Sequence, residues 1–183
     1  MLQNSILYTA RNNQQIELRT PTADEAQTTL DAMIEISESS PYILSTPESF
    51  KQRTTESQTK WIQDNISSQT SIIIAAYFNE KIIGFCNGQS YKDIKRSHRA
   101  TLGVSLHPQY RGLGLGRKIM EILIENMKKF SGVKIIELDV MVNNRTALKL
   151  YESLGFKKAG TFPKAFILPN GEISDNLKMY LEV

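Results

Sequence analysis

The sequence has few of the residues that build metal centres and covalent cross-links. It contains one cysteine and two histidines among 183 residues. A single cysteine cannot form an intrachain disulfide or a Cys-rich zinc site, and no His spacing typical of zinc ligands is present. Cys86 lies in the apolar-flanked run 82–86 and is expected to be a small buried residue. We therefore expect no metal site.

Long apolar runs and an excess of one charge are also missing. No window approaches the roughly 20 apolar residues that a transmembrane helix needs, and the start of the chain lacks the pattern of a signal peptide. Twenty-two Lys and Arg stand against 19 Asp and Glu, a net charge of +3, too small and too scattered to indicate nucleic-acid binding. We expect a cytoplasmic protein without membrane or nucleic-acid partners, in which an anionic ligand is bound locally.

The composition allows one domain. With 40% hydrophobic residues, the chain can bury one substantial core. Residues 1–15 are polar and rich in Asn and Gln, so we expect an N-terminal extension there and a domain over residues 16–183. Within that domain, residue patterns predict a strand at 16–19 and two helical regions, which start near residues 20–25 and at Thr46. Segments 71–78 and 81–85 follow as a hairpin.

The second half of the chain alternates strands and helices. The expected order is a strand at 100–106, a Gly-rich turn, a helix at 115–130, a strand at 133–142, a helix at 144–153 and a strand at 156–162. A hairpin follows, because Asn170 and Gly171 supply the positive φ values of a tight turn. The basic segment 91–99 is expected to be a solvated loop, with contact to a phosphate or an acidic acceptor as the alternative.

Residues 111–118, which read Arg-Gly-Leu-Gly-Leu-Gly-Arg-Lys, lie between a predicted strand and an amphipathic helix. Free backbone N–H groups and the positive end of such a helix can converge on an anion, and glycine lets the backbone approach phosphate closely. A P-loop would need Lys and then Ser or Thr after Gly116, and a Rossmann turn would need G-x-G-x-x-G. The pattern that remains is R-x-x-G-x-G, formed by Arg111, Gly114 and Gly116. It is typical of a phosphate-binding turn, and an ordinary strand-to-helix turn is the alternative.

This pattern and a second one together resemble the GNAT family of N-acetyltransferases, whose pyrophosphate-binding motif has the form R-x-x-G-x-G. Residues 144–156 are similar to the family segment N-x-x-A-x-x-L-Y-x-x-x-G-F and follow at the expected distance. The resemblance implies the GNAT fold, an α/β (α+β) architecture with a mixed central sheet of about seven strands flanked by about four helices. It also implies acetyl-CoA as co-substrate and direct attack by a primary amine in a ternary complex. It does not identify the acceptor, a small-molecule or protein amine.

The resemblance assigns cofactor contacts to residues between 106 and 151. The backbone N–H groups of Leu106 and His107 match those that polarise the thioester carbonyl in the family, and Asn144 matches an asparagine that helps to place the pantetheine arm. Tyr151 is a further expected contact. The residues of the phosphate-binding turn are Arg111, Gly112, Leu113, Gly114, Leu115, Gly116 and Arg117.

Acyl transfer to an amine also needs an acid for the departing thiolate and a base for the amine. Tyr151 matches the family tyrosine that often acts as the acid. Asp139 is the first candidate for the base, because some ribosomal-protein N-terminal acetyltransferases carry a glutamate there; Glu137, His98 or water are alternatives. A chain that binds acyl-CoA without a working base would be a non-catalytic acyl-CoA-binding module, the alternative function. The assembly is expected to be a monomer or a homodimer.

Overall fold

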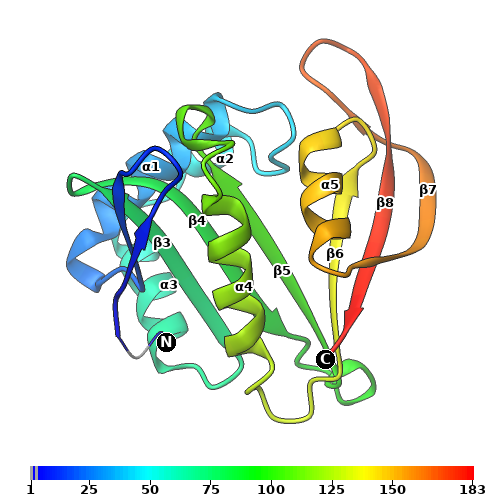
Figure 1. Ribbon diagram of the computed structural model, residues 1–183, viewed down its shortest axis with the longest axis horizontal. Helices are drawn as coiled ribbons and strands as arrows, with labels where there is room; N and C mark the ends of the chain where they lie inside the picture. The colour runs from blue at the N-terminus through cyan, green and yellow to red at the C-terminus, as the bar shows by residue number, and fades with distance from the viewer. Residues whose placement is uncertain (1, 3) are drawn as a thin grey trace.

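One mixed sheet of eight strands organises the fold, in the order β1-β2-β3-β4-β5-β6-β8-β7 (Figure 1). The structure is a computed structural model and describes residue 2 and residues 4–183. Met1 and Gln3, part of the expected extension, lie outside the described residues. The strands are β1 (Ile6–Thr9), β2 (Gln15–Arg19), β3 (Ser71–Phe78), β4 (Lys81–Ser90), β5 (Arg99–Leu106), β6 (Ile135–Met141), β7 (Lys157–Ile167) and β8 (Ile173–Glu182).

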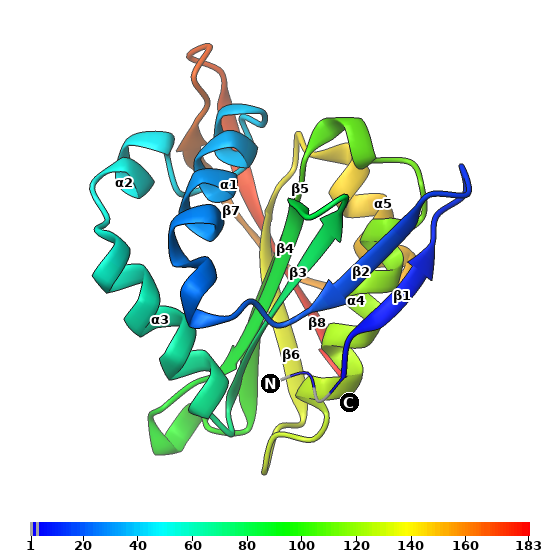
Figure 2. The ribbon, with the colours of Figure 1, turned by 90° about the vertical axis from the view of Figure 1, so that its left-hand side faces the viewer.

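Helices cover both faces of the sheet. Figure 2 shows α1 (Ala26–Glu38), α2 (Pro47–Lys51) and α3 (Thr55–Ser67) on one face and α4 (Leu115–Met127) and α5 (Arg145–Ser153) on the other. The central strands are therefore apolar on both sides. In β3, Ile72, Ile74 and Ala76 belong to the core beneath α4, whereas Ala75 and Tyr77 pack with residues of α1. This alternation follows from the two-residue period of a strand.

The GNAT-like mixed architecture expected from the sequence is confirmed, with one strand and one helix more than the approximate numbers. The additional strand is β1, in the segment expected to be a polar extension. It pairs antiparallel with β2, from Ile6 opposite Leu18 to Thr9 opposite Gln15. The additional helix arises because the region after Thr46 divides into α2 and α3. The side chain of Thr54 accepts a hydrogen bond from the Ser57 N–H and so caps a new helix.

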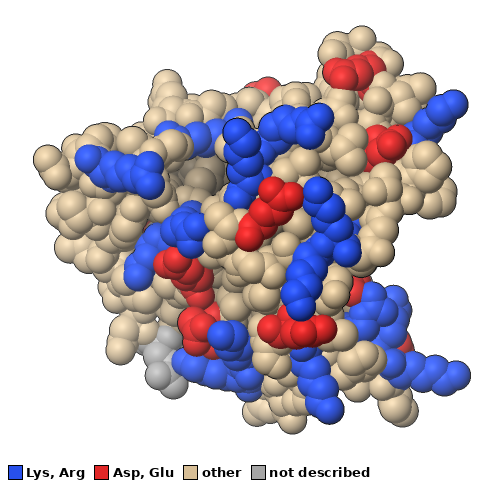
Figure 3. All heavy atoms as spheres, turned by 45° about the vertical axis from the view of Figure 1, so that its right-hand side comes forward, with Lys and Arg blue, Asp and Glu red and all other residues tan. Residues whose placement is uncertain are grey.

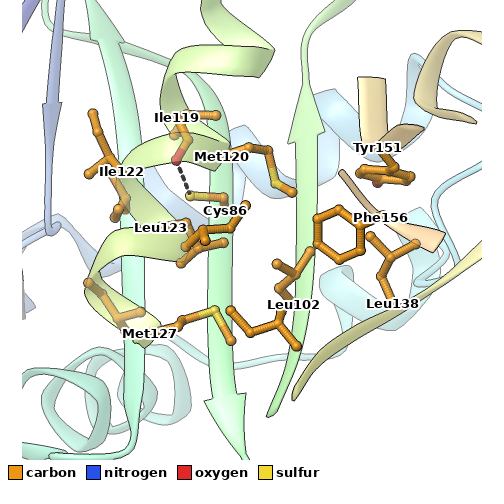
Figure 4. Packing of buried hydrophobic residues seen from close by; sticks show 14 of the residues in the cluster. Cys86, Leu102, Ile119, Met120, Ile122, Leu123, Met127, Leu138, Tyr151 and Phe156 are labelled. Carbon is orange, nitrogen blue, oxygen red and sulfur yellow. Dashed lines mark hydrogen bonds between the residues drawn. The ribbon is translucent and has the colours of Figure 1, made fainter. Parts of the chain in front are cut away.

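The largest core lies between α4 and the sheet. Leu115, Ile119, Leu123 and Met127 are fully buried at a spacing of four residues, which places them on one face of the helix. Cys86 lies beneath them, and its thiol donates to the carbonyl of Ile119 at 3.8 Å (Figure 4). Burial raises the pKa of this thiol. The prediction that Cys86 is a small buried residue is confirmed.

The surface shows no strong separation of charge on the face drawn in Figure 3, where Lys and Arg side chains are interleaved with Asp and Glu. This arrangement agrees with the small net charge of +3. Within residue 2 and residues 4–183, none of the helices combines the length and the apolar character that crossing a membrane requires.

Candidate functional site

A gap between two parallel strands forms the centre of the site. β5 pairs with β6 only through Arg99–Thr101 and Ile135–Glu137, although both strands continue beyond these residues. All other neighbouring strands are antiparallel. β5 and β6 diverge towards their carboxyl ends (Figure 1). A cavity of about 580 Å³ lies there, lined by both strands, by the glycine-rich turn and by α5. The divergence leaves backbone groups of β5 free for a ligand.

The backbone amides at the end of β5 do not all face this gap. The N–H of His107 donates to the carbonyl of Ile83 at 2.9 Å and so closes the ladder between β4 and β5. Because hydrogen-bonded and non-hydrogen-bonded pairs alternate in an antiparallel ladder, Leu106, opposite Gly84, directs its N–H the other way, into the gap. The expected role of the Leu106 amide fits this geometry. The role expected for the His107 amide is corrected, because the sheet already uses that N–H.

The turn before α4 has the backbone conformation that a phosphate-binding loop needs. Gly112 and Gly114 have φ values of +75° and +85°, which favour glycine. Gly114 is the N-cap of α4, and the first intrahelical bond runs from the N–H of Lys118 to its carbonyl. The N–H groups of residues 115–117 therefore have no partner within the helix. These amides and the positive helix end suit a pyrophosphate.

Close packing keeps this turn in place. A Cβ atom on Gly114 would lie 2.4 Å from the hydroxyl oxygen of Tyr8. That hydroxyl donates to the carbonyl of Leu113 at 3.1 Å, and the N–H of Arg11 donates to the same carbonyl at 3.2 Å. Leu115 is fully buried, so that only its backbone is available to a ligand. The β1–β2 hairpin thus supports the turn from outside.

The two arginines of the motif already have protein partners. Arg111 donates from Nε and Nη2 to the carbonyl of Leu106 at 3.1 and 2.9 Å, and burial lowers its pKa. Arg117 donates to the backbone carbonyl and the hydroxyl of Ser153 at 3.2 and 2.7 Å. These bonds connect the turn to β5 and to α5.

Arg11 is a site residue that the sequence did not predict. It lies in the turn between β1 and β2 and lines the same cavity as Gly112 and Gly114. Its side chain makes no hydrogen bond or ion pair with any residue that the structure describes, and its Nε would be 3.7 Å from a Cβ on Gly114. Two signals in the sequence could have found the hairpin: the alternation of Ile6, Tyr8 and Ala10, and the turn at Asn12 and Asn13.

Tyr151 projects from α5 into the cavity. Asn144 starts this helix, because its Oδ1 accepts a hydrogen bond from the N–H of Ala147 at 3.2 Å, and it lines the cavity as well. Tyr151 is 7% exposed, and its ring centroid lies 5.9 Å from that of Phe156 (Figure 4). Its hydroxyl finds no hydrogen-bond partner in the described part of the chain. Burial raises the pKa of Tyr151 to about 12, so the phenol stays protonated at neutral pH.

Asp139 is the carboxylate that lines the cavity. Its Oδ1 accepts from Nδ2 of Asn176 at 2.7 Å, and its Oδ2 lies 3.1 Å from Nζ of Lys178. The side chain is 44% exposed, so the carboxylate is not sealed off by its two partners. Asp139 and Tyr151 thus line the same cavity, an arrangement that an acid and a base acting together would need.

The other candidates for the base are placed less favourably. Glu137 is 3% exposed, accepts from the hydroxyl of Tyr91 at 2.6 Å, pairs with Arg99 and lies 3.0 Å from Nζ of Lys178. Although burial raises the pKa of Glu137, the bonds from Tyr91, Arg99 and Lys178 outweigh it and hold this pKa below its usual value. His98 lies on the exposed segment 91–99, none of which lines the cavity.

Three charged residues of segment 91–99 pair with neighbouring side chains. Arg96 pairs with Asp93 at 2.8 Å, and Arg99 pairs with Glu137. The interpretation as a solvated loop fits this arrangement better than a phosphate contact. Over residue 2 and residues 4–183, no group of three or more His, Cys, Asp or Glu side chains is arranged as a metal site would require.

Comparison with known proteins gives the chain a family. The family model described as Acetyltransferase (GNAT) family matches residues 30–156. The chain is 30% identical over 102 residues to the L-amino acid N-acetyltransferase AaaT of Escherichia coli, covering 56% of this chain and 62% of that protein. It is 44% identical over 61 residues to the ribosomal protein bS18-alanine N-acetyltransferase of Escherichia coli, covering 33% of this chain and 40% of that protein. The matches therefore span less than two thirds of these relatives.

Solved structures share the fold over most of the chain. The crystal structure of an acetyltransferase of the GNAT family from Streptococcus pneumoniae is similar with a TM-score of 0.86 at 21% identity, covering 92% of this chain and 99% of that one. The structure of yncA from Salmonella typhimurium with its cofactor acetyl-CoA is similar with a TM-score of 0.77 at 17% identity, covering 91% and 93%. At these identities the likeness establishes the fold.

Proposed function

The chain belongs to the GNAT family of acetyltransferases, and on this premise we propose that it transfers the acetyl group of acetyl-CoA to a primary amine by direct attack in a ternary complex. The observation that carries the proposal is the gap between β5 and β6 with the glycine-rich turn at its edge. One cavity there joins unpaired amides at a helix start to a phenol and a carboxylate. Such a set suits an anionic donor and a proton-dependent acyl transfer.

The donor half of the site would be made by backbone atoms. The N–H groups of residues 115–117 suit the pyrophosphate because they lie at the start of α4, and the glycines at 112, 114 and 116 carry no side chain that would keep a phosphate away. The N–H of Leu106 faces the gap and would donate to the thioester carbonyl. Asn144 would border the pantetheine arm. Acetyl-CoA, when bound, supplies an activated acyl group.

The transfer requires two proton movements, for which the cavity offers one group each. As the amine nitrogen bonds to the acyl carbon and the carbon–sulfur bond breaks, Asp139 would accept the proton that the nitrogen loses. Tyr151 would donate its phenolic proton to the departing sulfur. Tyr151 suits the acid role because its raised pKa, about 12, keeps it protonated. Lys178 and Asn176 would hold Asp139 in position.

The names of two relatives support an amine as acceptor. One acts on L-amino acids and the other on alanine of a ribosomal protein. Both classes present a primary amine to the donor. We extend only this shared feature to the present chain.

Thiol release separates catalysis from simple binding. The protein is mixed with acetyl-CoA and a panel of primary amines, while acetyl-CoA binding is measured in parallel by calorimetry. The expected result is amine-dependent formation of free CoA. A protein that binds acetyl-CoA but releases no thiol with any amine would instead be the non-catalytic acyl-CoA-binding module.

Arg11 should contribute to donor affinity. Its guanidinium lacks a partner among the described residues and lies beside Gly114, so we expect it to bind a phosphate oxygen of CoA. The Arg11→Gln variant should bind CoA about tenfold more weakly, and the difference should shrink as salt is added, because an exposed charge is screened. Calorimetry with CoA and with pantetheine, which lacks the phosphates, measures the effect.

Arg96→Gln provides the matched control for Arg11→Gln. Arg96 is an exposed arginine that pairs with Asp93 outside the cavity, so its loss should leave CoA affinity unchanged. An Arg11→Gln variant that loses equal affinity for pantetheine and for CoA would contradict a phosphate contact.

Asp139→Asn should slow turnover without weakening the donor complex. The amide keeps the shape of the carboxylate but cannot accept the proton of the amine, so kcat should fall about 10- to 100-fold. The affinity for acetyl-CoA should stay the same, because Asp139 lies away from the glycine-rich turn. Asp93→Asn, a change outside the cavity, should retain full activity. An Asp139→Asn variant that keeps the wild-type kcat would remove this residue from the mechanism.

A further inference from the structure

The half of the cavity away from the glycine-rich turn has an apolar wall. α1, the segment that follows it, α2, β4 and β7 all contribute to this wall, although they are far apart in the sequence. Its apolar residues include Met33, Ile36, Ile43, Phe50, Phe85 and Phe166. The polar residues that join them are all uncharged: Ser40, Tyr42, Ser45 and Asn87. An acceptor in this half would therefore present mostly apolar surface to the protein.

The charges that line the cavity are divided between its two ends. Its cationic lining residues are Arg11, Arg111 and Arg117, and all three lie at the glycine-rich turn. Its carboxylate is Asp139 on β6. Because Leu138 and Val140 of this strand pack in the core beneath α4, Asp139 points to the opposite face of the sheet, where the apolar wall lies. An ammonium group in the acceptor half would meet a partner of opposite charge, whereas a carboxylate would meet a charge of the same sign.

The cations beside Asp139 and Phe50 are already engaged. Lys178 lies between Glu137 at 3.0 Å and Asp139 at 3.1 Å. Arg53 stacks on the Phe50 ring at 4.9 Å but does not line the cavity. A substrate carboxylate bound beside Asp139 would therefore lose water without gaining an unpaired cation from the described residues, which is unfavourable.

We propose, building on the acetyl transfer proposed above, that the acceptor is a small primary amine carried on an aromatic or branched apolar group, without a carboxylate next to the amine. The cavity of about 580 Å³ has to hold the reactive end of the donor as well, which leaves space for a small acceptor. Asp139 receives the ammonium group and the apolar wall contacts the remainder. This specificity differs from that named for the amino-acid-acetylating relative.

A matched set of amines tests the proposal. Phenethylamine, L-phenylalaninamide and L-phenylalanine share the ring and the amine and differ only at the α-carbon, while ethylamine lacks the ring. Rates of thiol release are compared per deprotonated amine, since the four amines differ in basicity. We expect kcat/KM for phenethylamine to exceed that for L-phenylalanine and that for ethylamine by at least about tenfold each. L-phenylalaninamide carries an uncharged carboxamide in place of the carboxylate, so its kcat/KM should be close to that of phenethylamine.

A single substitution should shift this preference. Leu44 lines the cavity and is 72% exposed, so Leu44→Arg should fold and place a cation in the acceptor half. The ratio of kcat/KM for L-phenylalanine over phenethylamine should rise at least about fivefold. Ile94→Arg, at a position that is 92% exposed and outside the cavity, should leave the ratio unchanged.

The outcomes that overturn the proposal differ from those that overturn acetyl transfer. A wild-type protein that prefers L-phenylalanine or ethylamine, or one that acetylates only peptides, would refute the acceptor class and leave acetyl transfer standing. Thiol release that is faster with a longer acyl group than with acetyl would assign the apolar wall to the donor and refute the acceptor class, while acetyl transfer would still stand. A failure to release thiol with every amine would refute the acetyl transfer itself.

Discussion

Gly114→Ala is expected to weaken acetyl-CoA binding by at least about 100-fold, the sum of two effects at one residue. The φ of +85° strains any residue with a Cβ atom. The new Cβ would also lie 2.4 Å from the Tyr8 hydroxyl, which donates to the carbonyl of Leu113. To relieve both effects the turn must move, and the N–H groups at the start of α4 move with it. Calorimetry measures the affinity, and near-ultraviolet circular dichroism reports whether the fold persists.

Substitutions at two other glycines separate the effect of backbone strain from that of the clash with Tyr8. Gly132 has a φ of +78° and nothing within 4 Å of its virtual Cβ, so Gly132→Ala should show similar backbone strain but unchanged acetyl-CoA affinity. Gly116 has an ordinary φ, and its Cβ would be 3.4 Å from side-chain carbons of Leu106 and Leu150, which can adjust; Gly116→Ala should lose only a few-fold. A folded Gly114→Ala variant with wild-type affinity would disprove the assignment of the turn.

The sequence predicted those parts of the site whose geometry is local. The turn at residues 111–117 and the start of α4 follow from the glycine positions and from an amphipathic repeat. Each of these signals spans only about ten residues of sequence. α5 is equally local, because Asn144 caps it and Tyr151 lies two turns later. For these elements a pattern in the chain corresponds directly to a conformation.

The parts that escaped prediction depend on contacts between distant segments. β1 is short and lies among Asn and Gln residues, and it becomes a strand by pairing with β2 while Tyr8 bonds to Leu113, 105 residues away. The hydrogen bond from the His107 N–H to the Ile83 carbonyl depends on the register between β4 and β5, which no local pattern determines. The apolar wall could not be predicted for the same reason, since Met33, Phe85 and Phe166 come together only in the folded chain.

Tyr151→Phe should reduce kcat at least about 100-fold and leave acetyl-CoA affinity unchanged, because the substitution removes the proton donor alone. The remaining ring can still pack against Phe156, whose centroid is 5.9 Å away. The lost hydroxyl has no hydrogen-bond partner among the described residues, so stability should change little. Tyr77→Phe is the control, as its hydroxyl bonds to Glu25 at 3.3 Å outside the cavity, and turnover should persist.

The pH dependence gives this prediction a direction. The protonated phenol is the active form, and burial raises the pKa of Tyr151 to about 12, so its ionisation should cause no loss of activity below pH of about 11. The amine must be deprotonated to attack, and kcat/KM of the wild type should therefore rise with pH and then level off. For Tyr151→Phe, kcat/KM should rise over the same pH range but at lower values, since deprotonation of the amine still determines that rise. Stopped-flow thiol release over this range measures both, and a variant with wild-type kcat would show that the proton for the thiolate comes from elsewhere.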